Sequence, residues 1–310
     1  MTYLKIQGAI ILLLFLVDFI WISFSSLKVI YSSYLIFKIL GVSLFLYLLY
    51  LFYTRIRVDT KIGLLFISTL YLITFTAAAL ILSYLAYTIL NPLMDSALSI
   101  TDSRLGFSFS YFYYWFSKHQ AWDTFFTIIY HSLIYQNIFV FVYFGLFGRS
   151  IYLQRFLMMY MISILPTILL GSYYPALGPN ITFNLPPPDF LQKAMDYFMG
   201  LRHGILDLTQ EHGIIIFPSF HTTLGLIYLY TFRHEKIGLF LFFILLNLLM
   251  IFSIPIQGGH YLIDIIGGLY IFLITIKIED AIYVTIKKYG TLDFLPKRNS
   301  TTITKGGKLV

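Results

Sequence analysis

Two histidines in this chain each follow a short turn sequence and open an apolar run. The first is His221 in the stretch FPSFH, and the second is His260 in GGHYLID. Asp264 lies four residues after His260, so on a helix the two side chains share one face. A carboxylate there can accept the proton of one imidazole nitrogen and leave the other nitrogen free as a nucleophile. His221 has no such partner in the sequence and is expected to be the acid.

The residues that precede each histidine are suited to binding an anion. A glycine pair that ends in Gly259 comes directly before the second histidine, and without side chains it lets backbone N–H groups approach a ligand. Ser219 follows a proline and is the expected N-cap of the helix that carries the first histidine. A nucleophilic histidine, a histidine acid and two anion cradles together indicate phosphoryl transfer.

The amino-acid composition indicates whether the protein lies in water or in a membrane. Of the 310 residues, 59% are hydrophobic and only 11% are charged, whereas about 25% are charged in an ordinary soluble domain. The mean hydropathy is +0.82, and several apolar runs reach the ~20 residues that cross a bilayer as a helix. The chain contains no cysteine, which excludes disulfides and thiolate metal sites. The sequence therefore predicts an all-α, polytopic transmembrane helical bundle.

Eight membrane spans are predicted in this bundle. They lie near residues 8–24, 34–53, 63–90, 124–147, 151–170, 219–233, 238–256 and 260–278. The sixth span is short for a membrane crossing and the third is long, so the boundaries are approximate.

The Lys and Arg residues predict the orientation of the spans. Basic residues follow each even-numbered span, at Arg55, Arg57, Lys61, Arg149, Arg155, Arg233, Lys236 and in the tail. Because basic loops stay on the cytoplasmic side, both termini of this integral membrane protein are expected in the cytoplasm, and a bacterial inner membrane is the expected location. The polar segments 91–123 and 171–218 and both histidines then share the non-cytoplasmic face. The net charge of +7 follows from this topology, and no nucleic-acid partner is expected.

Three regions are predicted along the chain. Residues 1–120 hold the N-terminal spans and an outer segment, residues 121–280 form the catalytic membrane core, and residues 281–310 form a basic cytoplasmic tail. The aromatic stretch YFYYWFSKHQAW at 111–122 is typical of an amphipathic helix that lies at the membrane interface. After about residue 290 the hydrophobic periodicity is lost, which predicts a disordered end.

The pair of motifs resembles the type 2 phosphatidic acid phosphatase superfamily, which includes lipid phosphate phosphatases, vanadium haloperoxidases and sphingolipid-headgroup synthases. The likeness is closest to the branch of the inositol phosphorylceramide synthases and extends over roughly residues 120–280. It implies that His260 attacks phosphorus to give a phosphohistidine, that Asp264 orients it, and that His221 protonates the leaving group.

Three positions depart from the family pattern. Phe220 replaces the usual glycine of the Pro-Ser-Gly-His motif, Ile254 stands where an arginine is common, and the first motif, Lys-x6-Arg-Pro, is absent as written. A site for phosphate still needs a cation, because negative charge develops in the transition state. Arg202, in GLRHG just before the Pro-Ser motif, is the first candidate, and Lys193 is the second. With Ser219 and Gly259 they form the predicted phosphate-binding set.

Some polar residues and glycines could have other roles. The His-x3-Asp pair could bind a metal ion, with His203 or His212 as a third ligand. No other residues have ligand spacing, so a site without metal is expected. His131 and Asn137 in the fourth span are expected to hydrogen-bond to neighbouring helices, and the glycine pair at 267–268 is expected to allow close helix packing.

Two classes of function remain open. One is a membrane enzyme, without a cofactor, that hydrolyses or transfers the phosphate ester of a lipid phosphate or phospholipid. The other is a transporter or non-enzymatic membrane protein that uses the histidines as a proton relay. A transporter would carry polar residues in the middle of several spans, whereas these acid–base groups gather at one interface, which favours the enzyme. The substrate's identity, the choice between hydrolysis and transfer and the oligomeric state stay open.

Overall fold

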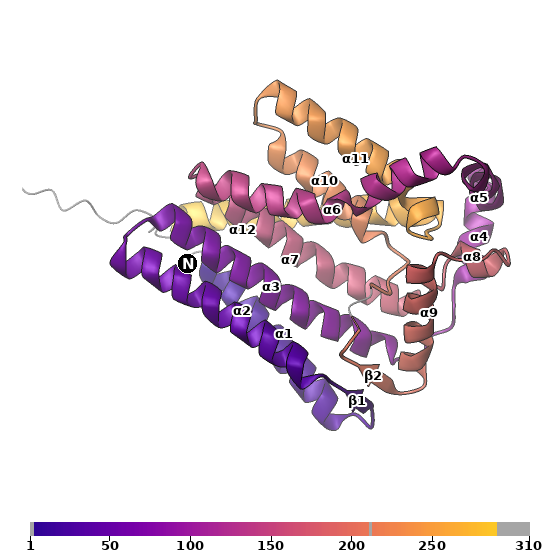
Figure 1. Ribbon diagram of the computed structural model, residues 1–310, viewed down its shortest axis with the longest axis horizontal. Helices are drawn as coiled ribbons and strands as arrows, with labels where there is room; N and C mark the ends of the chain where they lie inside the picture. Colours follow the sequence, from indigo (N-terminus) through magenta and orange to yellow (C-terminus); the bar gives the residue numbers. More distant parts are fainter. Residues whose placement is uncertain (1–2, 211–212, 290–310) are drawn as a thin grey trace, which may run out of the picture.

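A computed structural model of the chain describes residues 3–210 and 213–289. Helices dominate it, and long helices lie side by side as a bundle (Figure 1). The predicted all-α class is therefore confirmed, apart from one short pair of strands. His212 and the tail from residue 290 lie outside the described residues.

The long helices are α1 (Tyr3–Phe24), α2 (Ser33–Leu51), α3 (Thr60–Tyr87), α6 (Gln120–Leu146), α7 (Ser150–Tyr173), α11 (Ile237–Gln257) and α12 (Leu262–Tyr289). The shorter ones are η1 (Phe52–Ile56), α4 (Asp95–Arg104), α5 (Phe109–Lys118), α8 (Pro179–Thr182), α9 (Asp189–Arg202) and α10 (Phe220–Phe232). Strand β1 (Lys28–Ile30) pairs in parallel with β2 (Ile205–Asp207).

Six helices of the described chain are long and apolar enough to cross a membrane. They are α1, α2 continued by η1, α3, α6, α7 and α11. Helices also occupy the other two predicted spans. However, α10 has only 13 residues, and at 1.5 Å per residue it reaches about 20 Å, short of a ~30 Å hydrocarbon core. Multi-pass membrane character is thus confirmed, while the count of eight spans is not.

The polar segments gather at one end of the bundle. Helices α4, α5, α8 and α9 lie together there, and the strand pair lies at the same end (Figure 1). The pairing of β1 with β2 joins the loop after α1 to the segment between α7 and α10. Asp95 adds a second tie, because its carboxylate accepts hydrogen bonds from the N–H groups of Leu177 and Gly178. Segments predicted to share one face of the membrane are therefore in contact.

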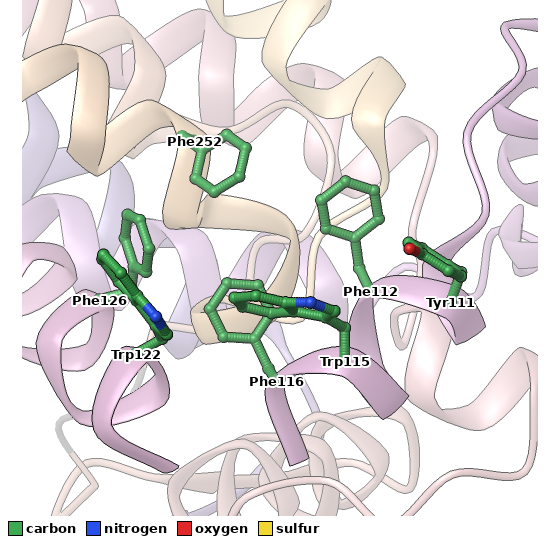
Figure 2. Close-up of a pocket in the computed structure, with 7 residues that line it drawn as sticks. All are labelled: Tyr111, Phe112, Trp115, Phe116, Trp122, Phe126 and Phe252. Carbon is green, nitrogen blue, oxygen red and sulfur yellow. The ribbon is translucent and has the colours of Figure 1, made fainter. Parts of the chain in front are cut away.

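A pocket of about 360 Å³, lined by aromatic rings, lies between helix α5 and the bundle. Figure 2 shows the seven rings around it, which come from α5, α6 and α11: Tyr111, Phe112, Trp115, Phe116, Trp122, Phe126 and Phe252. The predicted single helix over 111–122 is wrong in its extent, because α5 ends at Lys118 and α6 begins at Gln120. The two helices meet at a bend, where the buried rings of Phe116 and Phe126 pack edge-on.

The N-terminal helices pack directly on the helices that carry the motifs. Helix α3 lies against α6 and α7, and α1 lies against α3 and α7. A buried polar cluster links three of these helices. Tyr3 donates to Glu279 at 2.5 Å, and Nε of Arg155 lies 2.9 Å from the same carboxylate. Because Glu279 is fully buried, this pairing joins α1, α7 and α12 firmly. Helix α2 packs mainly on α3 and is left largely exposed.

Candidate active site

The two histidine motifs are brought together where α10 and α12 begin. The Ser219 N–H donates to the Asp264 carbonyl at 3.0 Å, and the Thr223 hydroxyl donates to the Gly268 carbonyl at 2.9 Å. A Cβ on Gly268 would lie 2.4 Å from the Ser219 carbonyl oxygen, so only glycine permits this approach. The predicted close packing at the glycine pair is confirmed, and it aligns the two motifs.

Asp264 holds the second histidine as the sequence predicts. Its Oδ2 lies 3.1 Å from Nδ1 of His260 and accepts the Tyr261 N–H at 2.8 Å. Asp264 is fully buried, and His260 is 4% exposed. The helix itself begins only at Leu262, so His260 lies before it rather than on its face. Asp264 therefore reaches back from the first turn in the manner of a capping box.

A second carboxylate, which the sequence analysis missed, caps the same helix. Asp102 of α4 accepts the Leu262 N–H at 2.7 Å and the Ile263 N–H at 3.0 Å, and its side chain is 4% exposed. Burial raises the pKa of the Asp102 carboxyl, and the two backbone hydrogen bonds oppose that shift. Protein carboxylates thus accept hydrogen bonds from the first N–H groups of α12. These N–H groups are therefore not free to bind an anion.

Other backbone donors remain available beside the histidines. Within the described ranges, the N–H groups of Gly259 and His260 have no acceptor. Gly259 has a φ of +61°, and a Cβ on it would lie 2.4 Å from Leu191 of α9, so a glycine is required there. Ser219 caps α10 as predicted by accepting the Thr222 N–H at 3.3 Å.

Tyr130 of α6 lies near both histidines. Its ring stacks on the His221 ring at 4.2 Å, and its hydroxyl lies 3.4 Å from Nδ1 of His221. A Cβ on Gly258 would lie 2.8 Å from that hydroxyl and 2.6 Å from Cδ2 of His260, so Tyr130 and the Cδ2 edge of His260 both lie next to Gly258. Nothing in the sequence marks this tyrosine among the 26 in the chain.

His131 also belongs to this cluster. Its ring packs edge-on against Tyr130 at 5.3 Å and lies 6.1 Å from the Phe190 ring of α9. Through Tyr130, whose ring stacks on His221, it lies one ring away from that histidine. The expected hydrogen bond from His131 to a neighbouring helix does not occur in the part of the chain that the structure describes.

The two predicted cations lie at different distances from the site. Leu191 of α9 meets Gly259, and Arg202 lies three turns further along that helix, ~16 Å away. Its guanidinium donates to the Asn91 carbonyl at 2.9 Å, so the structure does not bring Arg202 to the histidines. Lys193 is exposed on α9, half a turn from Leu191. Ile254, which replaces the family arginine, is fully buried.

A metal site gains no support from the described residues. Among residues 3–210 and 213–289, no three His, Cys, Asp or Glu side chains are grouped as metal ligands. His203, proposed as a third ligand, lies at the far end of α9, where its Nδ1 is 2.7 Å from the Met199 carbonyl.

Comparison with known proteins was made against family models, curated proteins and solved structures. A family model described as the PAP2 superfamily matches residues 96–278. The chain belongs to the PAP2 superfamily. No curated protein and no solved structure matches it. Membership in the PAP2 superfamily indicates a phosphatase-type enzyme that acts on phosphate esters. The match begins earlier than the predicted residue 120, so the PAP2 region includes Asp102.

Asp102 gives the first testable prediction. The Asp102→Ala variant loses the N-terminal cap of α12, which costs about 1–2 kcal/mol of stability, and loosens the segment that carries His260. We expect kcat for phosphate release to fall by about 10²-fold while KM changes little, because a small misplacement of a reacting group is costly. Asp102→Asn, which keeps one acceptor, should recover part of the rate.

Asp196→Ala provides the matched control, because this acid is exposed on α9. Its kcat should equal that of the wild type. A wild-type kcat in Asp102→Ala would show that the cap does not position His260.

Proposed function

We propose that this protein hydrolyses or transfers the phosphate ester of a lipid through a phosphohistidine formed on His260. The observation that carries the proposal is the buried pairing of Nδ1 of His260 with Asp264, because it leaves Nε2 as the free nitrogen beside Tyr130 and His221. Membership in the PAP2 superfamily supports chemistry on phosphate esters.

The first half-reaction follows from this geometry. Nε2 of His260 attacks phosphorus, a P–N bond forms, and the bond from phosphorus to the leaving oxygen breaks. His221 donates a proton to that oxygen, so the product leaves as an alcohol. Asp264 stabilises the positive charge that develops on the His260 ring.

The second half-reaction restores the enzyme. Water or an acceptor alcohol gives its proton to the now neutral His221 and attacks phosphorus, and the P–N bond breaks. Water yields inorganic phosphate, whereas an alcohol yields a new phosphate ester. Both outcomes share the first half-reaction, and the proposal covers both.

The charge of the phosphate is met by donors outside the start of α12. The N–H groups of Gly259 and His260 are available on one side, and those of Phe220 and His221 at the start of α10 on the other. Lys193 is the better placed of the two predicted cations. Preorganised donors of this kind stabilise the transition state by several kcal/mol.

The depth of the site supports a lipid substrate. Tyr130, which contacts His221 and lies near His260, is ten residues into α6, ~15 Å from the start of that helix. His221 stacks on Tyr130 and therefore lies at a similar depth. A recessed site between membrane helices is reached by molecules in the bilayer, and the grouping of the reactive groups at one end speaks against a proton relay across it.

Kinetics of four variants test the mechanism. His260→Ala should lose at least about 10³-fold in rate with every substrate, and Asp264→Asn about 10²-fold. His221→Ala should be slow with a lipid phosphate but near normal with p-nitrophenyl phosphate, whose leaving group needs no proton. Tyr135→Ala, at an exposed position of α6, is the control. The pH–rate profile should be bell-shaped because the two histidines react in opposite protonation states.

An equal loss in His221→Ala with both substrates would remove the acid role from His221. An active His260→Ala enzyme would overturn the proposal as a whole. In that case the proton-relay function would return to first place.

The orientation of the site is also proposed from the sequence, with both termini in the cytoplasm. The chain contains no cysteine, so single cysteines report accessibility cleanly. Asp196→Cys on α9 should react with a membrane-impermeant maleimide on intact cells, and Lys305→Cys in the tail should react only after permeabilisation. The reverse pattern would place the site on the cytoplasmic face.

A further inference from the structure

A large apolar groove runs along the N-terminal side of the bundle. It has a volume of about 880 Å³ and is walled by α2, α3 and α6. On α3 its lining extends from Leu65 to Tyr84, a length of ~28 Å. That is close to the ~30 Å thickness of a hydrocarbon core.

The groove has one polar end. Ser32 and Gln210 line it there, beside the strand pair and the other polar segments. The rest of the lining is mostly aliphatic and aromatic, including Ile134 and Ile138 of α6, which are 63% and 56% exposed. A polar end and a long apolar body match the shape of a lipid.

Helix α6 connects the groove to the candidate active site. Ile134 and Ile138 lie three and seven residues after His131, so all three share one face of the helix. His131 in turn packs edge-on against Tyr130, whose ring stacks on His221.

A second connection runs through α7. Tyr160 lines the groove, and its ring packs edge-on against Phe220 at 5.6 Å. Phe220 is the residue directly before His221, at the position where the family pattern has glycine. Groove residues on two helices are thus linked to the neighbours of His221.

We infer that this groove holds a hydrocarbon chain of the lipid whose phosphate reacts at His260. The inference rests on the proposed function, and it gives helices α2 and α3, which precede the matched range 96–278, a role in choosing the substrate. A chain seated along Ile138 and Ile134 leads its headgroup past His131 to the histidines. In this proposal, the molecule in the groove is the substrate lipid and not an unreactive lipid of the bilayer.

Variants that fill the groove test this inference. Ile138→Trp adds bulk inside the groove, and Tyr135→Trp adds it on a neighbouring face of α6 that is 72% exposed and outside the groove. Ala77→Phe fills the groove independently from α3. Each variant is assayed with dipalmitoyl phosphatidic acid in mixed micelles and with water-soluble p-nitrophenyl phosphate.

Both groove variants should lose at least about tenfold in kcat/KM with the long-chain lipid, because the phosphate no longer reaches its attack position. Their rates with p-nitrophenyl phosphate should stay within about twofold of the wild type, which also shows that the site is intact. Tyr135→Trp should match the wild type with both substrates. Unchanged rates with the lipid, or equal losses with both substrates, would overturn the groove assignment.

Photolabelling gives a readout that does not depend on turnover. Phosphatidic acid with a diazirine in its acyl chain should label peptides of α2, α3 and α6. Unlabelled phosphatidic acid should compete, and phosphatidylcholine should not. Labelling that both lipids suppress equally means bulk lipid only and overturns the inference. A wild-type enzyme that acts on neither phosphate ester nor on a phospholipid, with or without an acceptor alcohol, would instead refute the proposed function, and the labelling would still decide whether the groove binds the lipid.

Discussion

The first turn of α12 must satisfy its backbone N–H groups inside the protein, and this constraint shapes the whole site. A buried N–H without an acceptor is costly. Asp264 takes the N–H of Tyr261, and Asp102 takes those of Leu262 and Ile263. The same Asp264 oxygen faces His260. One set of hydrogen bonds therefore starts the helix and fixes the nucleophile.

This arrangement has an electrostatic consequence. Two carboxylates stand close to the place where a phosphate would react, and Ile254 supplies no positive charge. In the proposed function, a bound phosphate would then depend on loop N–H groups such as that of Gly259, on Lys193 and on the histidines themselves. His131, His221 and Tyr130 form one stacked cluster of rings, so a bound phosphate would lie beside imidazole groups that can donate hydrogen bonds to it.

Local patterns in the sequence predicted much of the site. The histidine pair, the i+4 aspartate and the Ser219 cap all depend on residues near each other in the chain, and the structure has each of them. Asp102 and Tyr130 could not be predicted, because they reach the site from distant helices and single residues of their types carry no signal. Helix α9 was missed because three prolines directly precede it. Arg202 was nominated from its place in the sequence, but the rigid length of α9 carries it away from the histidines.

The chemical state of His260 during turnover tests the account most directly. Purified enzyme is mixed with radiolabelled phosphatidic acid, quenched in base within milliseconds, digested and mapped by mass spectrometry. Because Nδ1 of His260 is held by Asp264, the phosphoryl group should be found on Nε2 of His260 and should be lost in acid. A phosphoryl group on another residue, or rapid turnover with no phosphoenzyme at any time, would contradict the account.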